Sequence, residues 1–122
     1  MVIRYDTSRP IYEQIIEYIL KKLASGKLEA GDKLPSQRSL AQELDVNPNT
    51  VQRAYREMEL QELVETKRGL GTFVTESDTR IREVSQELSQ KVITEFVEQM
   101  RFLGYKDSEI IERLEEVLNQ NP

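Results

Sequence analysis

The chain has 122 residues, a formal net charge of −5, no cysteine and no histidine. This length allows one compact domain with an appendage, and the lack of cysteine excludes a disulfide framework and a thiolate metal site. Met1–Asp6 contains no apolar run of signal-peptide length and no window approaches a membrane span, so we expect a soluble, cytoplasmic protein.

The first predicted helix begins at Pro10 and ends near Ala24. Its apolar residues recur at helical spacing in one wide stripe, which indicates a helix with one face in the core. Ser25-Gly26 closes it, since glycine suits the left-handed position after a helix end. A loop or short strand around Leu28 follows. The stripe consists of Ile11, Tyr12, Ile15, Ile16, Ile19, Leu20 and Leu23.

Two short helices separated by a tight turn are predicted next. Ser36 can cap the first helix, which runs to a turn at Asp45-Val46. Asn47 can cap the second helix, and Pro48 stands at its first position, where proline is tolerated. Helix starts this close together are typical of a helix-turn-helix, whose second helix is free to enter a major groove of DNA.

The second of these helices divides into two faces. Apolar residues at positions i, i+3, i+4 and i+7 predict a buried face made of Val51, Ala54, Tyr55 and Met58. Polar residues off this stripe would face a DNA groove or, in the alternative, only solvent. Gln52 would suit adenine and Arg53 guanine if their side chains reach base edges. The polar set is Asn49, Thr50, Gln52, Arg53 and Arg56.

A β-hairpin is predicted after this helix. Residues 63–66 and 72–75 are rich in β-branched side chains, and a glycine-containing loop joins them. A hairpin directly after a recognition helix is the arrangement called a wing. Lys67 and Arg68 near its tip would contact phosphates or, in the alternative, only keep the tip soluble.

Together these segments resemble the winged helix-turn-helix domain of the GntR family of bacterial transcription regulators. The resemblance spans about residues 9–75 and rests on PIYEQI (10–15), GDKLPS (31–36), TV (50–51) and GLGTFV (69–74). It implies DNA contact for Arg38, phosphate contacts for Ser36 and Thr50, and the role of wing glycine for Gly71. Pro48 and Gln52 stand where many family members have arginine, so a base preference does not carry over.

A further pair of helices is predicted after the wing. The first begins at Asp78-Thr79 and ends near Gly104, and Asp107 or Ser108 caps the second. Their apolar stripes need a partner, which is either the first domain or a second copy of the chain. We favour the second copy, since groove readers commonly pair across two half-sites. The expected dimerisation residues are Leu88, Val92, Phe96, Met100, Ile111, Leu114 and Leu118.

We therefore predict a mainly α fold with a small β-hairpin. Residues 1–76 form a winged helix-turn-helix domain, and residues 77–122 form a two-helix dimerisation region. The first 75 residues carry 11 basic and 11 acidic side chains and the remainder carry 6 and 11, so the negative charge lies after the wing. A neutral head can still bind DNA if its cations gather on one face.

The short two-helix region resembles the YtrA subfamily, which implies a homodimeric repressor of an inverted-repeat operator, often for transporter genes. One competing class is an enzyme. The sequence gives it little support, because histidine and cysteine are absent and the carboxylates, lysines, hydroxyls and tyrosines show no recognisable catalytic spacing. We expect no cofactor and no metal. The other alternative is a protein-binding adaptor that uses the winged fold without DNA. The sequence identifies no operator, regulated gene or effector ligand.

Overall fold

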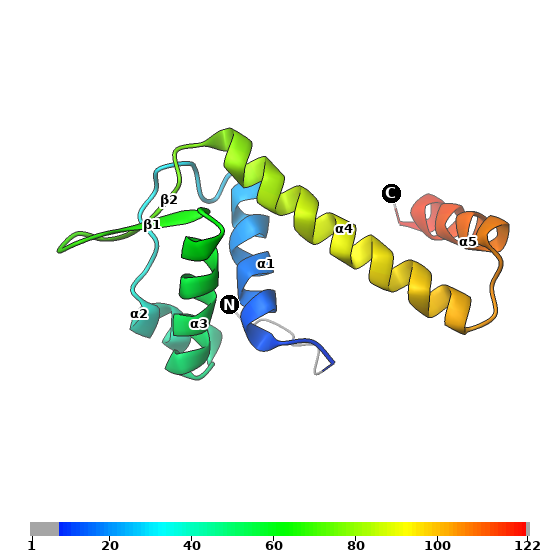
Figure 1. Ribbon diagram of the computed structural model, residues 1–122, viewed down its shortest axis with the longest axis horizontal. Helices are drawn as coiled ribbons and strands as arrows, with labels where there is room; N and C mark the ends of the chain where they lie inside the picture. Colours follow the sequence, from blue (N-terminus) through cyan, green and yellow to red (C-terminus); the bar gives the residue numbers. More distant parts are fainter. Residues whose placement is uncertain (1–7, 122) are drawn as a thin grey trace. The chain divides into compact units, whose positions relative to one another are not determined.

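A computed structural model describes residues 8–121, so the prediction for Met1–Asp6 lies outside the described residues. The described part contains five helices and one two-stranded antiparallel sheet (Figure 1), which confirms the predicted fold class. In chain order the elements are α1 (Ile11–Ala24), α2 (Gln37–Leu44), α3 (Pro48–Leu60), β1 (Val64–Lys67), β2 (Gly71–Val74), α4 (Asp78–Phe102) and α5 (Asp107–Gln120).

The described residues fall into two compact units, the head, which ends at Ser85, and the tail, which starts at Gln86. The head holds α1 to α3, both strands and the beginning of α4, and the tail holds the rest of α4 and α5. This division lies within α4. None of the helices within residues 8–121 is both long and apolar enough to span a membrane.

α1 supplies one side of the head core and lies beside α3 (Figure 1). Ile15 and Ile19 are buried almost completely, which confirms the predicted core-facing stripe. Tyr12, which we expected in the core, is only half-buried. The guanidinium of Arg53 lies over its ring, at 4.1 Å from the ring centroid.

Local hydrogen bonds define the starts of α2 and α3 and the turn between them. Ser36 Oγ accepts the backbone N–H of Ser39 at 3.1 Å, and Asn47 Oδ1 accepts that of Asn49 at 2.8 Å, so both predicted N-caps are confirmed. Asp45 ends α2 with a left-handed φ of 53°, which aspartate tolerates better than most residues. The chain thus reverses quickly, and α3 packs against α2.

Two buried tyrosines of the head donate hydrogen bonds to residues outside their own helices. Tyr55 of α3 donates its hydroxyl to the carbonyl oxygen of Pro35 at 2.6 Å, and its predicted burial is confirmed. Tyr18 of α1 donates to Glu43 Oε1 of α2 at 3.3 Å. Tyr18 lies outside the predicted stripe, and its burial depends on this polar partner from another helix.

We predict that Tyr55→Phe lowers the free energy of unfolding by about 1 kcal/mol at pH 7, because the buried hydrogen bond is lost. Burial, and secondarily the nearby Glu43 carboxylate, raises the pKa of the Tyr55 hydroxyl above its ordinary value. An unfolded tyrosine ionises near pH 10, so the hydroxyl's contribution is present below about pH 10 and is lost as the pH rises further. Urea unfolding at pH 7 and at higher pH should show the gap between wild type and variant narrowing above about pH 10. A gap that stays constant would contradict this account.

β1 and β2 form the predicted hairpin, but its loop is shorter than expected. Lys67 and Gly71, which we assigned to the loop, pair with each other, and only residues 68–70 connect the strands. Each strand is therefore shifted by one residue from the prediction. The reason is that backbone pairing, and not side-chain type, decides where a strand ends.

A third extended segment, residues 32–34, pairs with the other edge of β2. The N–H of Leu34 donates to the Thr72 carbonyl and the N–H of Val74 donates to the Asp32 carbonyl, each at 2.8 Å. The chain around Leu28, where a loop or a short strand was expected, is loop. The wing is thus fastened to the segment that leads into α2.

The start of α5 differs from the prediction. α4 begins at Asp78 as expected, but neither Asp107 nor Ser108 caps α5. Asp107 is already the first helical residue, and the Glu109 carboxylate accepts the N–H of Lys106 at 3.0 Å. The helix start is therefore held from within its first turn.

Residues 103–106 link α4 to α5. Gly104, near the predicted end of α4, has a left-handed φ of 93° that suits glycine. Arg101 Nε donates to Asp107 Oδ1 at 3.0 Å, and this guanidinium holds the pKa of the Asp107 carboxyl below its usual value. Both side chains are exposed, so the pair stabilises the fold little.

Candidate nucleic-acid interface

α3 presents a polar face over residues 48–56, which includes the N-terminal residues that contact bases in helix-turn-helix proteins. Thr50 is half-buried, and the other predicted contact residues, Asn49, Gln52, Arg53 and Arg56, are exposed. The predicted buried face is confirmed for Val51, Ala54, Tyr55 and Met58. The carboxylates of α3, Glu57 and Glu59, lie only in its C-terminal half. The helix can therefore approach DNA with an N-terminal half that is free of carboxylates.

Arg53 is held by α1 and not left free in solvent. Its guanidinium lies 4.1 Å from the centroid of the Tyr12 ring, within the range of a cation–π interaction. The stack occupies one face of the guanidinium and leaves the N–H groups at its edge available for an anion. Sequence reasoning missed this contact, because the two residues come from different helices.

The start of α2 carries two predicted contact residues in different settings. Arg38 is exposed. The Ser36 hydroxyl accepts the Ser39 N–H as the cap and donates to Ser39 Oγ at 2.9 Å. Ser36 therefore has a structural role in α2, whereas Arg38 is exposed on its first turn.

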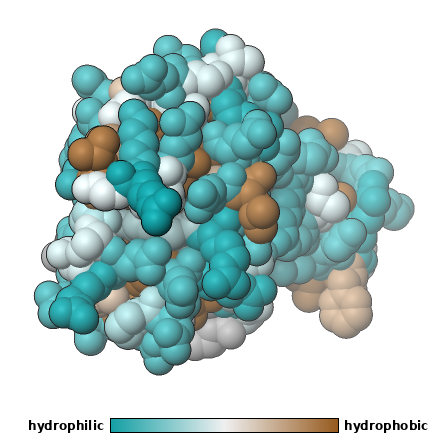
Figure 2. Space-filling model, turned by 60° about the vertical axis from the view of Figure 1, so that its left-hand side comes forward, coloured by the Kyte–Doolittle hydropathy of each residue, from teal (hydrophilic) through white to brown (hydrophobic). Residues whose placement is uncertain are grey.

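The wing carries the other predicted cations. Arg68 is exposed in the loop, and the ammonium of Lys67 lies 4.7 Å from the centroid of the Phe73 ring on the paired strand. Figure 2 shows that the face with the wing is largely hydrophilic, with apolar residues only in scattered patches. The wing thus presents two exposed positive charges, one of which lies over an aromatic ring.

Gly71 allows a further cation, Lys33, to approach the wing. Gly71 has a φ of 118°, and a Cβ placed there would lie 2.8 Å from Lys33 Cε. Lys33 pairs with Phe73 in an isolated bridge at the edge of the hairpin. Sequence reasoning did not select Lys33. Its position two residues before the LPS motif's proline gave no signal without the pairing of its segment to β2.

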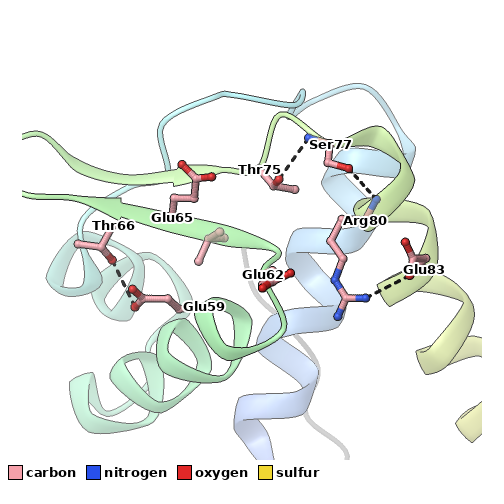
Figure 3. A pocket seen from close by; sticks show the side chains of 9 residues that line it. Glu59, Glu62, Glu65, Thr66, Thr75, Ser77, Arg80 and Glu83 are labelled. Atoms are coloured by element: carbon pink, nitrogen blue, oxygen red, sulfur yellow. Dashed lines mark hydrogen bonds and ion pairs between the residues drawn. The ribbon is translucent and has the colours of Figure 1, made fainter.

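Two grooves flank the hairpin, and they differ in charge. The groove beside β2 runs to the start of α2 and is lined by Lys33, Ser36, Gln37, Ser39 and Thr72 among others. The groove beside β1 is lined by four carboxylates, from Glu59, Glu62, Glu65 and Glu83, together with Arg80 (Figure 3). Phosphates are attracted to the first groove and repelled by the second. The surface suited to nucleic acid therefore lies among the cations of α2 and α3 and Lys33 beside β2.

The tail carries apolar side chains that remain exposed to solvent in the described part of the chain. Leu114 is 45% exposed and Leu118 is 58% exposed, whereas Ile110 on the same helix is buried. Among the other predicted dimerisation residues, Val92 and Ile111 are exposed and Leu88, Phe96 and Met100 are half-buried. Val117, which the helical spacing places in the same apolar stripe of α5, is also exposed, and so are three residues that sequence reasoning did not select, namely Ile93, Phe102 and Leu103.

Comparison with known proteins relates the chain to transcription regulators. Residues 11–74, from the start of α1 to the end of β2, match the family described as bacterial regulatory proteins, gntR family. The chain is 44% identical over 109 residues to the HTH-type transcriptional regulator YhcF of Bacillus subtilis, covering 89% of this chain and 90% of YhcF. It is 40% identical over 93 residues to the HTH-type transcriptional repressor YtrA of the same organism, covering 71% and 72%.

Solved structures agree with these relatives. A GntR family transcriptional regulator from Listeria monocytogenes superposes with a TM-score of 0.77 at 41% identity, covering 92% of this chain and 98% of that one. The DNA-binding domain of AraR in complex with its operator ORX1 superposes with a TM-score of 0.55 at 28% identity, covering 62% and 95%. The first similarity extends through the tail and the second concerns the DNA-binding part.

Proposed function

Because the chain belongs to the GntR family of bacterial regulatory proteins, which are DNA-binding transcription regulators and not enzymes, we propose that it is a homodimeric repressor of an inverted-repeat operator. One observation carries this proposal: α3 exposes a polar face over residues 48–56 that includes Arg53 and Arg56, beside a wing with further cations. Each protomer would place α3 in one major-groove half-site. Such a regulator acts where the chromosome is, which in a bacterium is the cytoplasm.

The proposed DNA contacts divide by chemistry. Residues of α3 that project from its N-terminal half would read base edges, and groups of α2 and the wing would bind phosphates. Arg53 has its guanidinium stacked on Tyr12, which favours contact by its edge. The proposed contact set is Ser36, Arg38, Asn49, Thr50, Gln52, Arg53, Arg56, Lys67, Arg68 and Gly71, with Lys33 added from its place beside the wing.

Dimerisation through the tail is the second part of the proposal. An amphipathic helix with a largely exposed apolar face, such as α5, requires a partner to be stable in water. A second copy supplies a matching face by symmetry, and it also supplies the second recognition helix that an inverted repeat needs. Similarity to the repressor YtrA supports repression, and resemblance to the YtrA subfamily supports transporter genes as targets.

Selection of bound duplexes from a random library, followed by binding of the selected duplex at several salt concentrations, tests the DNA-binding proposal. We expect enrichment of an inverted repeat. Its association constant should fall steeply with salt, by roughly three orders of magnitude between 50 and 200 mM if about six or more phosphates are neutralised. A folded dimer that enriches no sequence and binds duplexes without salt dependence would favour the adaptor function instead.

A further inference from the structure

Arg80, in the first turn of α4, lies against the end of the recognition helix α3 (Figure 3). Its Nε donates to the carbonyl oxygen of Gln61, the residue directly after α3, at 2.6 Å. Its Nη1 donates to Glu83 Oε2, one turn further along α4, at 3.4 Å. The Arg80 side chain is only 25% exposed. One side chain therefore joins the end of α3 to the start of α4.

The start of α4 is also held by its own cap. Ser77 Oγ accepts the N–H of Arg80 at 3.1 Å, and Thr75 Oγ1 accepts the N–H of Ser77 at 3.2 Å. Thr75 is buried directly after β2, and Val84 is buried on α4. The backbone of the first turn is thus anchored next to the wing, and Arg80 adds a side-chain hydrogen bond to the end of α3.

The chemistry of this link favours a fixed direction. Carbonyls at the end of a helix carry partial negative charge, so a guanidinium there is attracted by the helix dipole as well as by the hydrogen bond. The planar fork of arginine loses little further freedom once it is bound, unlike the flexible ammonium of lysine. Glu62 has a left-handed φ of 59°, so the chain turns sharply just where Arg80 binds.

We infer that Arg80 is a positioning residue that holds the first turns of α4, up to Ser85, against the end of α3 within the head, and thereby narrows the half-site spacing that a dimer accepts. This rests on the proposed function, because spacing has meaning only for two recognition helices on one operator. α4 continues without a break to Phe102, so the turn that holds Arg80 belongs to the same helix as several of the proposed dimerisation residues, namely Leu88, Val92, Phe96 and Met100.

Operator spacing is a sensitive measure of how firmly this turn is held. Adding one base pair between two half-sites moves them apart by about 3.4 Å and rotates them by roughly 35°, since one turn takes about 10 base pairs. A dimer with a rigid link between α3 and α4 accepts one spacing. A dimer with a loose link accepts several.

The first arm of the test measures the link without DNA. The chain has no cysteine, so nitroxide labels at Leu60→Cys on α3 and Ser85→Cys on α4, both within the head, are unique. Both parent residues are exposed, and dilution with unlabelled protein isolates distances within one protomer. Arg80→Met keeps an apolar stem but removes the donors. We expect it to broaden the distance distribution about twofold, whereas Arg82→Met, at an exposed arginine on the same helix, should leave the width unchanged.

The second arm uses the selected operator with one base pair inserted or removed between its half-sites. We expect wild-type affinity to fall about tenfold or more, and that of Arg80→Met to fall less than about threefold relative to its own best duplex. If Arg80→Met does not fold, Arg80→Lys takes its place, and the same broadening is expected because a single flexible donor replaces the fork.

An unchanged label distribution in the variant would overturn the inference, and so would a variant with the wild-type spacing profile. A wild type that accepts all spacings equally would overturn it without any variant. Failure of the wild type to bind any duplex would instead overturn the proposed function and with it the spacing role. The label distances would still decide whether Arg80 holds the start of α4 against α3.

Discussion

Leu114→Asp should convert the protein from dimers to monomers at micromolar concentration. Leu114 lies on the apolar face of α5, where it is 45% exposed in the isolated chain. In a tail-mediated dimer, the substitution would put two unpaired charges, one from each protomer, into an apolar interface, at a total cost of about 3 kcal/mol or more. This cost raises the dimer dissociation constant by roughly 100-fold, which sedimentation velocity over a concentration series would measure.

Operator affinity should fall together with the dimer. Two linked recognition helices gain roughly 100-fold or more over one, so the monomeric variant should lose at least that factor. Asn119→Asp adds the same charge to an exposed position elsewhere on α5 and should change neither property. If Leu114→Asp remains folded and fully dimeric, dimerisation through the tail is wrong.

Arg38→Ala should weaken binding to the selected operator about 10- to 100-fold, which is the effect of about 1 to 3 kcal/mol expected for a specific arginine contact. Its exposure at the start of α2 predicts little change in thermal stability. Titration of labelled operator, together with a thermal melt, measures both quantities.

The pattern of loss also distinguishes the kind of contact made by Arg38. Loss of a base contact would relax selectivity at one operator position, whereas loss of a phosphate contact would weaken all sequences alike and lower the salt slope by about 1. Arg82→Ala removes an equal charge from exposed α4 and serves as the control. Unchanged affinity of Arg38→Ala would remove this residue from the interface.

Sequence patterns predicted the parts of the fold that depend on neighbours in the chain. The caps at Ser36 and Asn47 and the buried face of α3 follow from local hydrogen bonding and helical period, and the structure confirms them. The start of α5 was mispredicted because two polar residues in a row offered plausible caps. A glutamate within the first turn fulfils that role instead.

Contacts between distant residues were beyond sequence reasoning. The pairing of residues 32–34 with β2 brings Lys33 to the wing, and the packing of α1 on α3 brings Tyr12 under Arg53. Neither contact has a local signal, because each depends on how separate elements pack together. The same holds for Arg80, whose partner Gln61 lies 19 residues earlier in the chain.

The stoichiometry of the protein on its selected duplex tests the central claim most directly. Native mass spectrometry of the complex should show two protomers on one duplex that contains an inverted repeat. A duplex with one half-site scrambled should lose most of its affinity, since both recognition helices are needed. A complex of one protomer with full affinity, or a folded protein that forms no complex with any duplex, would contradict the account.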